Sequence, residues 1–460
     1  MKRVFSLVVV LSLLLVALPA AAQTSLTYGS GIQIQNQSAD EATVTITFYE
    51  QTGSVAAEFT GITIDGNGSQ TYGSLDPTAN PGGVGVDSGF SGSAVIQSDQ
   101  PVVAIVNTVA NSYSYGASSG SFSEGAAEVL LPLIMRGNYD YNTWFNIQNT
   151  SATEDAVVVV EYVAGSAGTD LTLAAITIPP GAAATLDQSA ADHAGLGDTF
   201  VGSAKLTSTG GEIVATAIEV GPTTLFAYNG FTGGSTNPVM PLAQFNNYGY
   251  VTGMQIMNIG DTDTEVTVTY TPSSAGDAVD EAYTIAAGAS VTFNRPEGGV
   301  AYGTSTFVGS ATVTGNSASQ PLVVVANQLN SGENKGAAYG GFDPAGASEV
   351  VALPLIMDRN YGYFTGFSIA NAGSAATTVT YSCTGTDGAA YAAVLNADTA
   401  YTNIAAGAAA APVQYNLIAD SYVGACTVTA ESGGEIIGIV NELSVSSTGD
   451  AFLVYEGFNQ

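Results

Sequence analysis

The chain carries one pattern four times, and this repetition constrains its fold more than any other feature. Segments that end in asparagine (GIQIQN, FNIQN, MQIMN and FSIAN) close at intervals of 113, 109 and 113 residues. A second marker, FSGSA, FVGSA, FVGSA and YVGAC, follows each of them in the same order. Two independent markers with one order and nearly one period predict tandem units of about 110 residues, an ordinary domain size. The four asparagines are Asn36, Asn149, Asn258 and Asn371.

Within each unit the apolar residues follow the period of β-strands. TVTITF (43–48) alternates apolar residues with threonine, as a half-buried strand does, and VVVVEY (157–162) is typical of a strand covered on both faces. IPPGAAATL (178–186) places a glycine at a turn, and Asn67 takes that place in the first copy because asparagine tolerates a left-handed backbone. We therefore predict an all-β chain of four tandem immunoglobulin-like antiparallel β-sandwich domains.

The N-terminus has the three parts of a secretory signal peptide. Lys2 and Arg3 precede an apolar run from 4 to 18, and small residues follow at 20–22. A single membrane anchor is the alternative, but roughly 15 apolar residues are short for a span, which needs about 20. We expect a secreted, extracellular or cell-surface protein. The predicted limits are 1–22 for the signal peptide and 23–128, 129–237, 238–349 and 350–460 for the four repeats.

The charge of the chain excludes two classes of partner. The formal net charge is −32, with only 7 basic residues, and loss of Lys2 and Arg3 would bring it to −34. Such a surface repels nucleic acid and anionic lipid. We expect no nucleic-acid partner and no membrane insertion after the signal peptide is removed. Because 46% of the residues are hydrophobic, the chain can still build packed cores.

The two cysteines predict one disulfide in the fourth unit. Cys383 and Cys426 both follow strand motifs, and aligning the second unit on its tyrosine and FVGSA places Ala164 and Ala204 at those positions. Two small residues in one copy and two cysteines in another are expected if the positions face each other. Secretion favours a disulfide over free thiols or a metal pair.

Catalytic and metal-binding motifs are sparse, and we expect no enzymatic activity and no cofactor. The one histidine, His193, lies in an insertion-like segment that we interpret as a surface loop, and no nucleophile-elbow motif accompanies it. Asp261, Asp263 and Glu265 alternate in GDTDTE and form a weak calcium candidate. They lack the spacing and the glycine of an EF-hand, so a solvated turn is the simpler interpretation.

Polar and aromatic motifs suggest modification and packing. Asn36, Asn67 and Asn149 lie in sequons and are possible glycosylation sites, although a structural role in ending a strand explains Asn36 and Asn149 equally well. An NYxY motif recurs beside each predicted domain junction, and we interpret its tyrosines as junction packing, with sugar stacking as the alternative. These tyrosines are Tyr139, Tyr141, Tyr248, Tyr250, Tyr361 and Tyr363.

The combination of (L/M)PL, NYxY and IxN, with SDQPVVAIVN and a closing AYxGF, resembles tandem immunoglobulin-like β-sandwich repeats of secreted bacterial surface and fibril proteins. The resemblance implies an extracellular structural or adhesive role and carries no catalytic residues. Our leading hypothesis is a homo-polymer, a subunit of an extracellular fibril or surface layer that assembles by open-edge strand pairing or head-to-tail contacts. The alternative is an adhesin or carbohydrate-binding protein that recognises surface glycans with its sandwich-end loops.

The apolar segment VLLPLIM (129–135) and its copies precede the second, third and fourth units. Because proline is tolerated at sheet edges, we predict an edge strand at each junction. The first unit shows no such copy ahead of its IxN strand, which predicts an open edge, and Ser25, Leu26, Thr27 and Tyr28 are our candidate for assembly there. The junction-strand residues are Leu131, Pro132, Leu133, Pro241, Leu242, Pro354 and Leu355.

Overall fold

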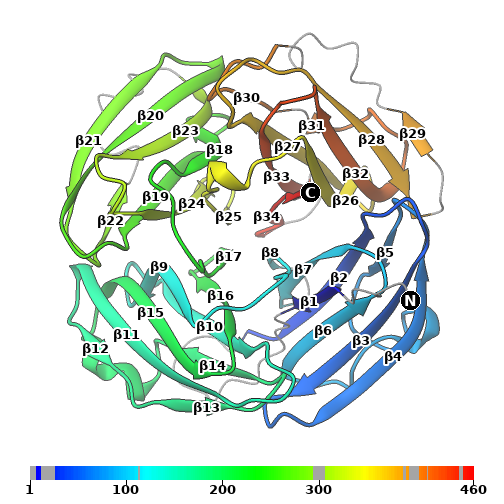
Figure 1. Cartoon of the computed structure of the whole chain (residues 1–460), viewed down its shortest axis with the longest axis horizontal. Coiled ribbons are helices and arrows are strands. Elements are labelled where there is room, and N and C mark those ends of the chain that lie inside the picture. The colour runs from blue at the N-terminus through cyan, green and yellow to red at the C-terminus, as the bar shows by residue number, and fades with distance from the viewer. Residues whose placement is uncertain are drawn as a thin grey trace.

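The four repeats form a closed ring of β-sandwiches (Figure 1). Each repeat contributes an outer sheet and a second sheet, here called the axial sheet, whose last strand reaches the centre of the ring. We refer to the repeats as units 1 to 4. The predicted fold class, tandem antiparallel β-sandwiches, is confirmed. The computed structural model describes residues 7–11, 26–111, 114–293, 306–386, 390–392, 403–411, 413–444 and 449–460.

Units 1 and 2 have the same strand order. In unit 1 the outer sheet is β1 (Leu7–Leu11), β6 (Gly92–Ser98), β3 (Ala42–Glu50) and β4 (Val55–Ile64), and the axial sheet is β5 (Ser69–Tyr72), β2 (Tyr28–Asn36), β7 (Val102–Ala110) and β8 (Tyr115–Gly120). In unit 2 the outer sheet is β9 (Glu128–Arg136), β15 (Phe200–Gly210) and β11 (Ala156–Ala167), which β12 (Leu171–Thr172) and β13 (Ile176–Ile178) both join, and the axial sheet is β14 (Ala183–Asp187), β10 (Asn142–Asn149), β16 (Ile213–Val220) and β17 (Leu225–Asn229).

Units 3 and 4 repeat this order. In unit 3 the outer sheet is β18 (Val239–Phe245), β23 (Phe307–Gly315), β20 (Thr264–Ala275) and β21 (Val279–Ile285), and the axial sheet is β22 (Ser290–Phe293), β19 (Val251–Asn258), β24 (Leu322–Asn330) and β25 (Lys335–Gly340). In unit 4 the outer sheet is β29 (Ala390–Ala392), β28 (Val379–Gly385), β32 (Tyr422–Ala430), β26 (Val350–Asp358) and β35 (Phe458–Asn459), and the axial sheet is β30 (Ala409–Ala410), β27 (Tyr363–Asn371), β33 (Ile436–Ser444) and β34 (Phe452–Glu456), with β31 (Val413–Gln414) also on β27. Short 3-10 helices are η1 (Pro81–Gly83), η2 (Ala191–Leu196) and η3 (Pro344–Gly346).

Alternation along the strands builds the sandwich cores. In β3, Val44, Ile46 and Phe48 are fully buried between the two sheets of unit 1, whereas Thr43 is exposed. This is the period-2 pattern expected from TVTITF. The turn prediction also holds: Asn67 has a φ of 57°, and Gly181 at the corresponding turn of unit 2 has a φ of 71°.

A buried asparagine at the end of each IxN strand ties three segments of its unit together. In unit 2, Asn149 donates its side-chain amide to the carbonyls of Glu154 (2.7 Å) and Ile178 (2.9 Å), and its Oδ1 accepts the backbone N–H of Ser151 (2.9 Å). Because every polar atom of the side chain is used, the strand-ending role accounts for the repetition. Asn36, Asn258 and Asn371 make the same contacts.

This arrangement corrects two of the three candidate glycosylation sites. Asn36 and Asn149 are fully buried, and the amide nitrogen that would carry a glycan donates hydrogen bonds inside the unit. A glycan cannot be attached there without breaking the fold. Asn67 is exposed at its turn, and it stays a prediction.

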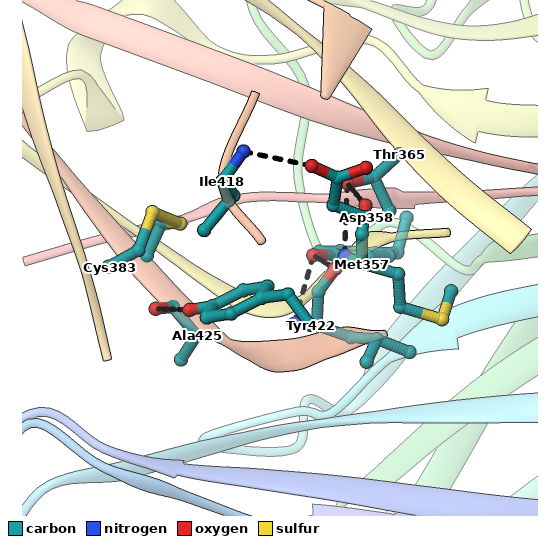
Figure 2. Close-up of a disulfide and its surroundings, with 10 residues drawn as sticks. Met357, Asp358, Thr365, Cys383, Ile418, Tyr422 and Ala425 are labelled. Carbon is teal, nitrogen blue, oxygen red and sulfur yellow. Dashed lines mark hydrogen bonds between the residues drawn. A yellow bond between two sulfur atoms is a disulfide. The ribbon is translucent and has the colours of Figure 1, made fainter. Parts of the chain in front are cut away.

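The predicted disulfide joins Cys383 and Cys426 across neighbouring strands of unit 4 (Figure 2). Its predicted alignment with unit 2 is wrong by two residues. In unit 2 the residue paired with Ala204 is Tyr162, and Ala164 pairs with Gly202. The disulfide therefore stands where unit 2 has a buried aromatic residue against alanine. Asp358, also drawn in Figure 2, accepts the backbone N–H of Ile418 with its carboxylate (2.8 Å).

His193 is not a surface residue, contrary to the sequence-based interpretation. It lies in η2, fully buried, with its Nε2 3.0 Å from the hydroxyl of Tyr162 and its Nδ1 2.7 Å from Asp192 Oδ1. Gln188 also donates to the Tyr162 hydroxyl (2.8 Å). The segment 188–196 therefore folds inward and covers one end of the unit 2 core, and its histidine has a structural role.

Candidate functional site at the ring axis

The centre of the ring is built by the last axial strand of each unit. β8 contacts β17, β17 contacts β25, β25 contacts β34, and β34 returns to β8, so the four strands close around one axis (Figure 1). The strand period and the repeat markers of the sequence do not predict this closure. The tandem units are therefore arranged as a ring and not as an extended rod.

One carboxylate near one end of the axis touches all four units. Asp450, in the loop before β34, accepts the backbone N–H of Leu225 from unit 2 (2.6 Å) and of Gly336 from unit 3 (2.8 Å). Its own N–H donates to the carbonyl of Ser114 in unit 1 (2.9 Å). Burial raises the pKa of Asp450 to about 8, although these amide hydrogen bonds and the nearby Lys335 act in the opposite direction.

Deeper in the ring, hydrogen-bonded side-chain pairs seal three of the four junctions. Asn327 of unit 3 donates to Glu219 of unit 2 (2.8 Å), and Gln328 and Asn441 exchange two amide hydrogen bonds between units 3 and 4 (3.0 and 3.3 Å). At the junction of units 4 and 1, Asn107 donates to Glu442 (2.9 Å). The six residues occupy two successive positions of the strands β7, β16, β24 and β33: the asparagines share the first, and the glutamates and Gln328 share the second.

Burial favours the neutral form of the two glutamates in these pairs. Glu219 and Glu442 are buried, and desolvation raises the pKa of each to about 8, against the amide hydrogen bonds from Asn327 and Asn107. Glu219 Oε1 and Asn327 Oδ1 are both buried without a hydrogen-bond partner. A proton on Glu219 Oε1 could be donated to Asn327 Oδ1, so that both atoms would have a partner. The acid–amide pair would then have two hydrogen bonds, as Gln328 and Asn441 have.

The junction between units 1 and 2 has no such side-chain pair at these positions, although Ser93 donates to the Gly181 carbonyl across it (2.6 Å). The equivalent residues there are Thr108 and Ile218, and the space beside them is filled by Trp144. The indole ring of Trp144 lies edge-on to Tyr28, with ring centroids 5.6 Å apart, and its N–H donates to the Tyr28 hydroxyl (3.3 Å). One tryptophan thus replaces a polar pair.

The other end of the axis carries a small hollow of about 270 Å³. Side chains of alternating size surround it: Asn229 donates to the Gly120 carbonyl (2.9 Å), and Glu456 accepts the Gly340 N–H (2.6 Å). A Cβ at Gly120 would lie 3.2 Å from the Phe458 ring, so glycine makes room for the aromatic ring of the preceding unit, unit 4. The hollow is lined by equivalent residues of all four units, among them Phe122, Phe231, Phe342 and Phe458.

The predicted junction strands are β9, β18 and β26, which we call the opening strands. β9 and β18 lie at sheet edges, and β26 is followed only by the two-residue strand β35. Each opening strand bulges at its Leu-Pro or Met-Pro step: Leu131 pairs with Ala204 and Ile134 with Gly202, so Pro132 and Leu133 share one partner position. This placement suits proline because its missing N–H falls outside the ladder.

A tyrosine from the axial sheet holds each bulge. Tyr228 donates its hydroxyl hydrogen to the carbonyl of Leu133 (2.6 Å), and Tyr455 donates to that of Leu355 (2.7 Å). Tyr339 makes the same bond with Leu242. We call these three contacts the tyrosine clamps. The equivalent residue in unit 1, read back from the closing phenylalanine, is Ser119.

The strand that covers the outer edge of unit 1 comes from the predicted signal peptide. β1 pairs with β6 and brings Leu11 opposite Ala94, the position that Leu131 takes opposite Ala204 in unit 2. The residues proposed for assembly are used elsewhere: Thr27 exchanges hydrogen bonds with Asn111, and Leu26 and Tyr28 pack in the junction with unit 2. That assignment is therefore wrong for Leu26, Thr27 and Tyr28, while Ser25 lies outside the described residues.

The calcium candidate is not assembled into a site. Asp261 accepts the side-chain amide of Gln320 (3.2 Å), and Asp263 accepts the backbone N–H of Ala287 (3.3 Å). Glu265 lies on β20 and accepts a long hydrogen bond from Asn316. Each carboxylate thus has its own local partner, and no cluster of three potential metal ligands occurs in the described part of the chain.

The NYxY tyrosines divide into two kinds, so their common interpretation as junction packing is half wrong. The second tyrosine packs inward, as Tyr250 does edge-on against Phe452 of the next unit at 5.2 Å. The first tyrosine is 88 to 94% exposed in all three copies and has a left-handed backbone with φ near 50°. These exposed residues are Tyr139, Tyr248 and Tyr361.

Comparison with known proteins leaves the family open. No protein-family model and no curated protein matches the chain. The crystal structure of Thermotoga maritima 1070 is 17% identical and covers 24% of this chain and 96% of that chain, with a TM-score of 0.19. The pilus backbone of Streptococcus pneumoniae is 12% identical and covers 77% and 86%, with a TM-score of 0.14. The described residues include no helix that could cross a membrane.

Proposed function

We propose that the chain is a secreted, non-enzymatic structural protein of the cell surface, and that the closed ring is its building block. The observation that supports this is the contact of Asp450 with three other units, because it joins all four repeats at one point of the ring. Since the repeats close on one another, head-to-tail contacts between successive repeats are used up inside the molecule. Assembly into a fibril or layer then proceeds through contacts between rings.

Electron microscopy of the exported protein tests this proposal. We expect stacked or laterally ordered ring-shaped particles, and more of them at high salt, because the rings are strongly acidic and salt screens their repulsion. Dispersed single rings at every salt and calcium concentration would contradict a structural role.

A second candidate function, glycan binding by the loops at one end of the sandwiches, is favoured by the exposed tyrosines. A non-glycine residue at positive φ is uncommon, and bulky exposed aromatic rings are available for stacking on sugars. A glycan array probed with the ring and with the triple variant Y139A/Y248A/Y361A separates the two candidates. Binding that disappears in the variant supports recognition, and its absence in both proteins leaves the structural role. The three residues are Tyr139, Tyr248 and Tyr361.

A further inference from the structure

We infer that the outer edge of unit 1, strand β6, is a dimerisation site that the chain's own N-terminal segment covers until that segment is removed. Once the segment is removed, β6 pairs antiparallel with β6 of a second copy. The inference rests on the proposed secretion, because signal-peptide cleavage after residue 22 would remove β1.

The outer side of β6 is covered by a different strand than in the other units. In units 2, 3 and 4, the strand equivalent to β6 has an opening strand along its outer side: β9 on β15, β18 on β23 and β26 on β32. In unit 1 that side is covered by β1, with Leu7 opposite Ser98 and Leu11 opposite Ala94. Without β1, a row of backbone N–H and C=O groups along β6 would have no partner.

The sequence spacing gives the N-terminal segment a proline at the same distance from the IxN asparagine as the other three opening strands. Pro132, Pro241 and Pro354 each lie 17 residues before the asparagine that ends the IxN strand. Pro19 lies 17 residues before Asn36 and follows a leucine, as two of the other three do. The register in the structure differs from this spacing, because Leu11, seven residues before Leu18, lies opposite Ala94 as Leu131 lies opposite Ala204. The segment predicted to be cleaved contains both the spacing match and the strand that covers β6.

Unit 1 lacks the tyrosine that holds the opening strand in each of the other units. Tyr228, Tyr339 and Tyr455 clamp the opening strands of their own units. Unit 1 has Ser119 at this position, and a serine hydroxyl is too short to span the same distance. The other three opening strands are thus fixed in place, whereas the first can be lost.

A second copy of β6 is the partner that fits the opened edge. Residues 92–98 read GSAVIQS, with no charge and no proline, so the strand lacks the features by which proteins block exposed edges. The clamped opening strands of another ring are not free to be donated. Two identical edges related by a two-fold axis can pair with each other, and this contact closes after two copies.

The experiment compares two forms of the full chain: one exported and processed by a bacterial host, and one produced without export so that residues 1–22 remain. Intact mass identifies the N-terminus, and sedimentation velocity gives the oligomeric state. We expect a dimer that begins at Gln23 and a monomer that begins at Met1. In the uncleaved form, the pair V8C/Q97C should form an intramolecular disulfide, because Val8 and Gln97 are register partners.

An edge variant and its matched control complete the test. V95K/Q97K places two charges on β6, and we expect it to raise the dimer dissociation constant at least about tenfold. T312K/T314K places the same charges at the equivalent positions of β23, whose edge is covered by β18, and should leave the dimer unchanged. Val95 and Thr312 are half-buried, and Gln97 and Thr314 are exposed.

Each other result contradicts the inference and identifies what failed. An exported chain that keeps residues 1–22 refutes the secretion on which the inference rests. A processed chain that is monomeric, or a dimer that V95K/Q97K does not weaken, refutes β6 pairing and leaves secretion intact. Adding the peptide EVLLPLIMR, the β9 sequence, should dissociate the dimer by filling the same edge, and a dimer that resists it refutes the assigned site.

Discussion

Unit 1 differs from the other three units in the side chains that hold its first strand and that contact the following unit. Units 2 to 4 each hold an opening strand with a tyrosine clamp, and each seals its junction with the following unit by a polar pair on the buried axial strands. Unit 1 has Ser119 in place of the clamp, and at its junction with unit 2 Trp144 packs on Tyr28 where the other junctions have a polar pair. The backbone closes equally well in both cases.

The difference shows that the ring does not depend on one kind of contact. A buried polar pair contributes little net free energy but fixes which atoms must meet, because a mismatched donor or acceptor is costly. An apolar contact contributes more through burial and specifies less. The three polar pairs therefore fix the register at their junctions, and the packing of Trp144 adds stability at the junction of units 1 and 2.

The largest loss of stability is expected from removing the Trp144 side chain between units 1 and 2. Trp144 is 2% exposed, so Trp144→Ala leaves a cavity between units 1 and 2 and should lower the free energy of unfolding by about 4 kcal/mol. The loss should be equal at pH 5 and pH 9 because no titratable carboxyl takes part. Urea unfolding followed by circular dichroism measures it. Trp144→Phe, which keeps most of the volume, should lose much less, and a pH-dependent loss would contradict the assignment.

The second largest effect is expected at the contact that all four units share. Asp450→Ala leaves the amide N–H groups of Leu225 and Gly336 buried without acceptors, which should cost about 3 kcal/mol in total. Asp450→Asn supplies one acceptor and should recover part of this loss. If the alanine variant unfolds at the wild-type urea concentration, Asp450 does not hold the ring closed.

The glutamates of the polar junctions should make the ring less stable as the pH rises. The pKa values of Glu219 and Glu442 are about 8 in the ring, whereas an unfolded glutamate titrates near 4.3. A raised pKa means that the folded chain binds more protons, so the free energy of unfolding should fall as the pH rises from about 4.5 to about 8. Urea unfolding midpoints at intervals across this range measure the slope.

The junction between units 3 and 4 supplies the matched control within the chain. There Gln328 stands where units 2 and 4 have glutamate, and it makes both amide hydrogen bonds with Asn441. Glu219→Gln and Glu442→Gln should reproduce this pair, gain about 2 kcal/mol at pH 9 and flatten the slope. Asp450 should retain part of the slope, because its pKa is also about 8. A steeper slope in the double glutamine variant would show that the glutamates are ionised in the ring.

Local features of this fold could be predicted because they depend on residues close together in the sequence. The strand period, the left-handed turn at Asn67 and the facing cysteines follow from neighbouring residues and from comparison of the copies. The ring could not be predicted, because its closure depends on side chains of successive units about 110 residues apart. The sequence did contain one sign of contacts between units, an asparagine at the end of each of the apolar runs PVVAIVN and PLVVVAN. These residues, Asn107 and Asn327, both reach a neighbouring unit.

The burial of single polar residues also could not be predicted from their neighbours in the sequence. His193 lies in a glycine-rich, charged segment that is typical of a surface loop, yet its ring contacts Tyr162 in the core of unit 2. Asn36 fits a sequon, although its amide is consumed by carbonyls of its own unit. In both cases one partner is distant in the sequence, Tyr162 for His193 and Ile64 for Asn36, and the neighbouring residues give no sign of that contact.

The smallest effect is expected from the tyrosine clamps, and it separates unit 1 from the rest most directly. Tyr228→Phe removes one hydroxyl and leaves the carbonyl of Leu133 without its donor, which should cost about 1 kcal/mol. Ser119→Ala at the equivalent position of unit 1 should cost nothing measurable, because no opening strand is held there. Hydrogen exchange adds a local measurement: Tyr228→Phe should speed exchange in β9 and leave β18 unchanged, since Tyr339 still clamps β18. Equal protection of β9 in both proteins would mean that the proline bulge is held by packing alone.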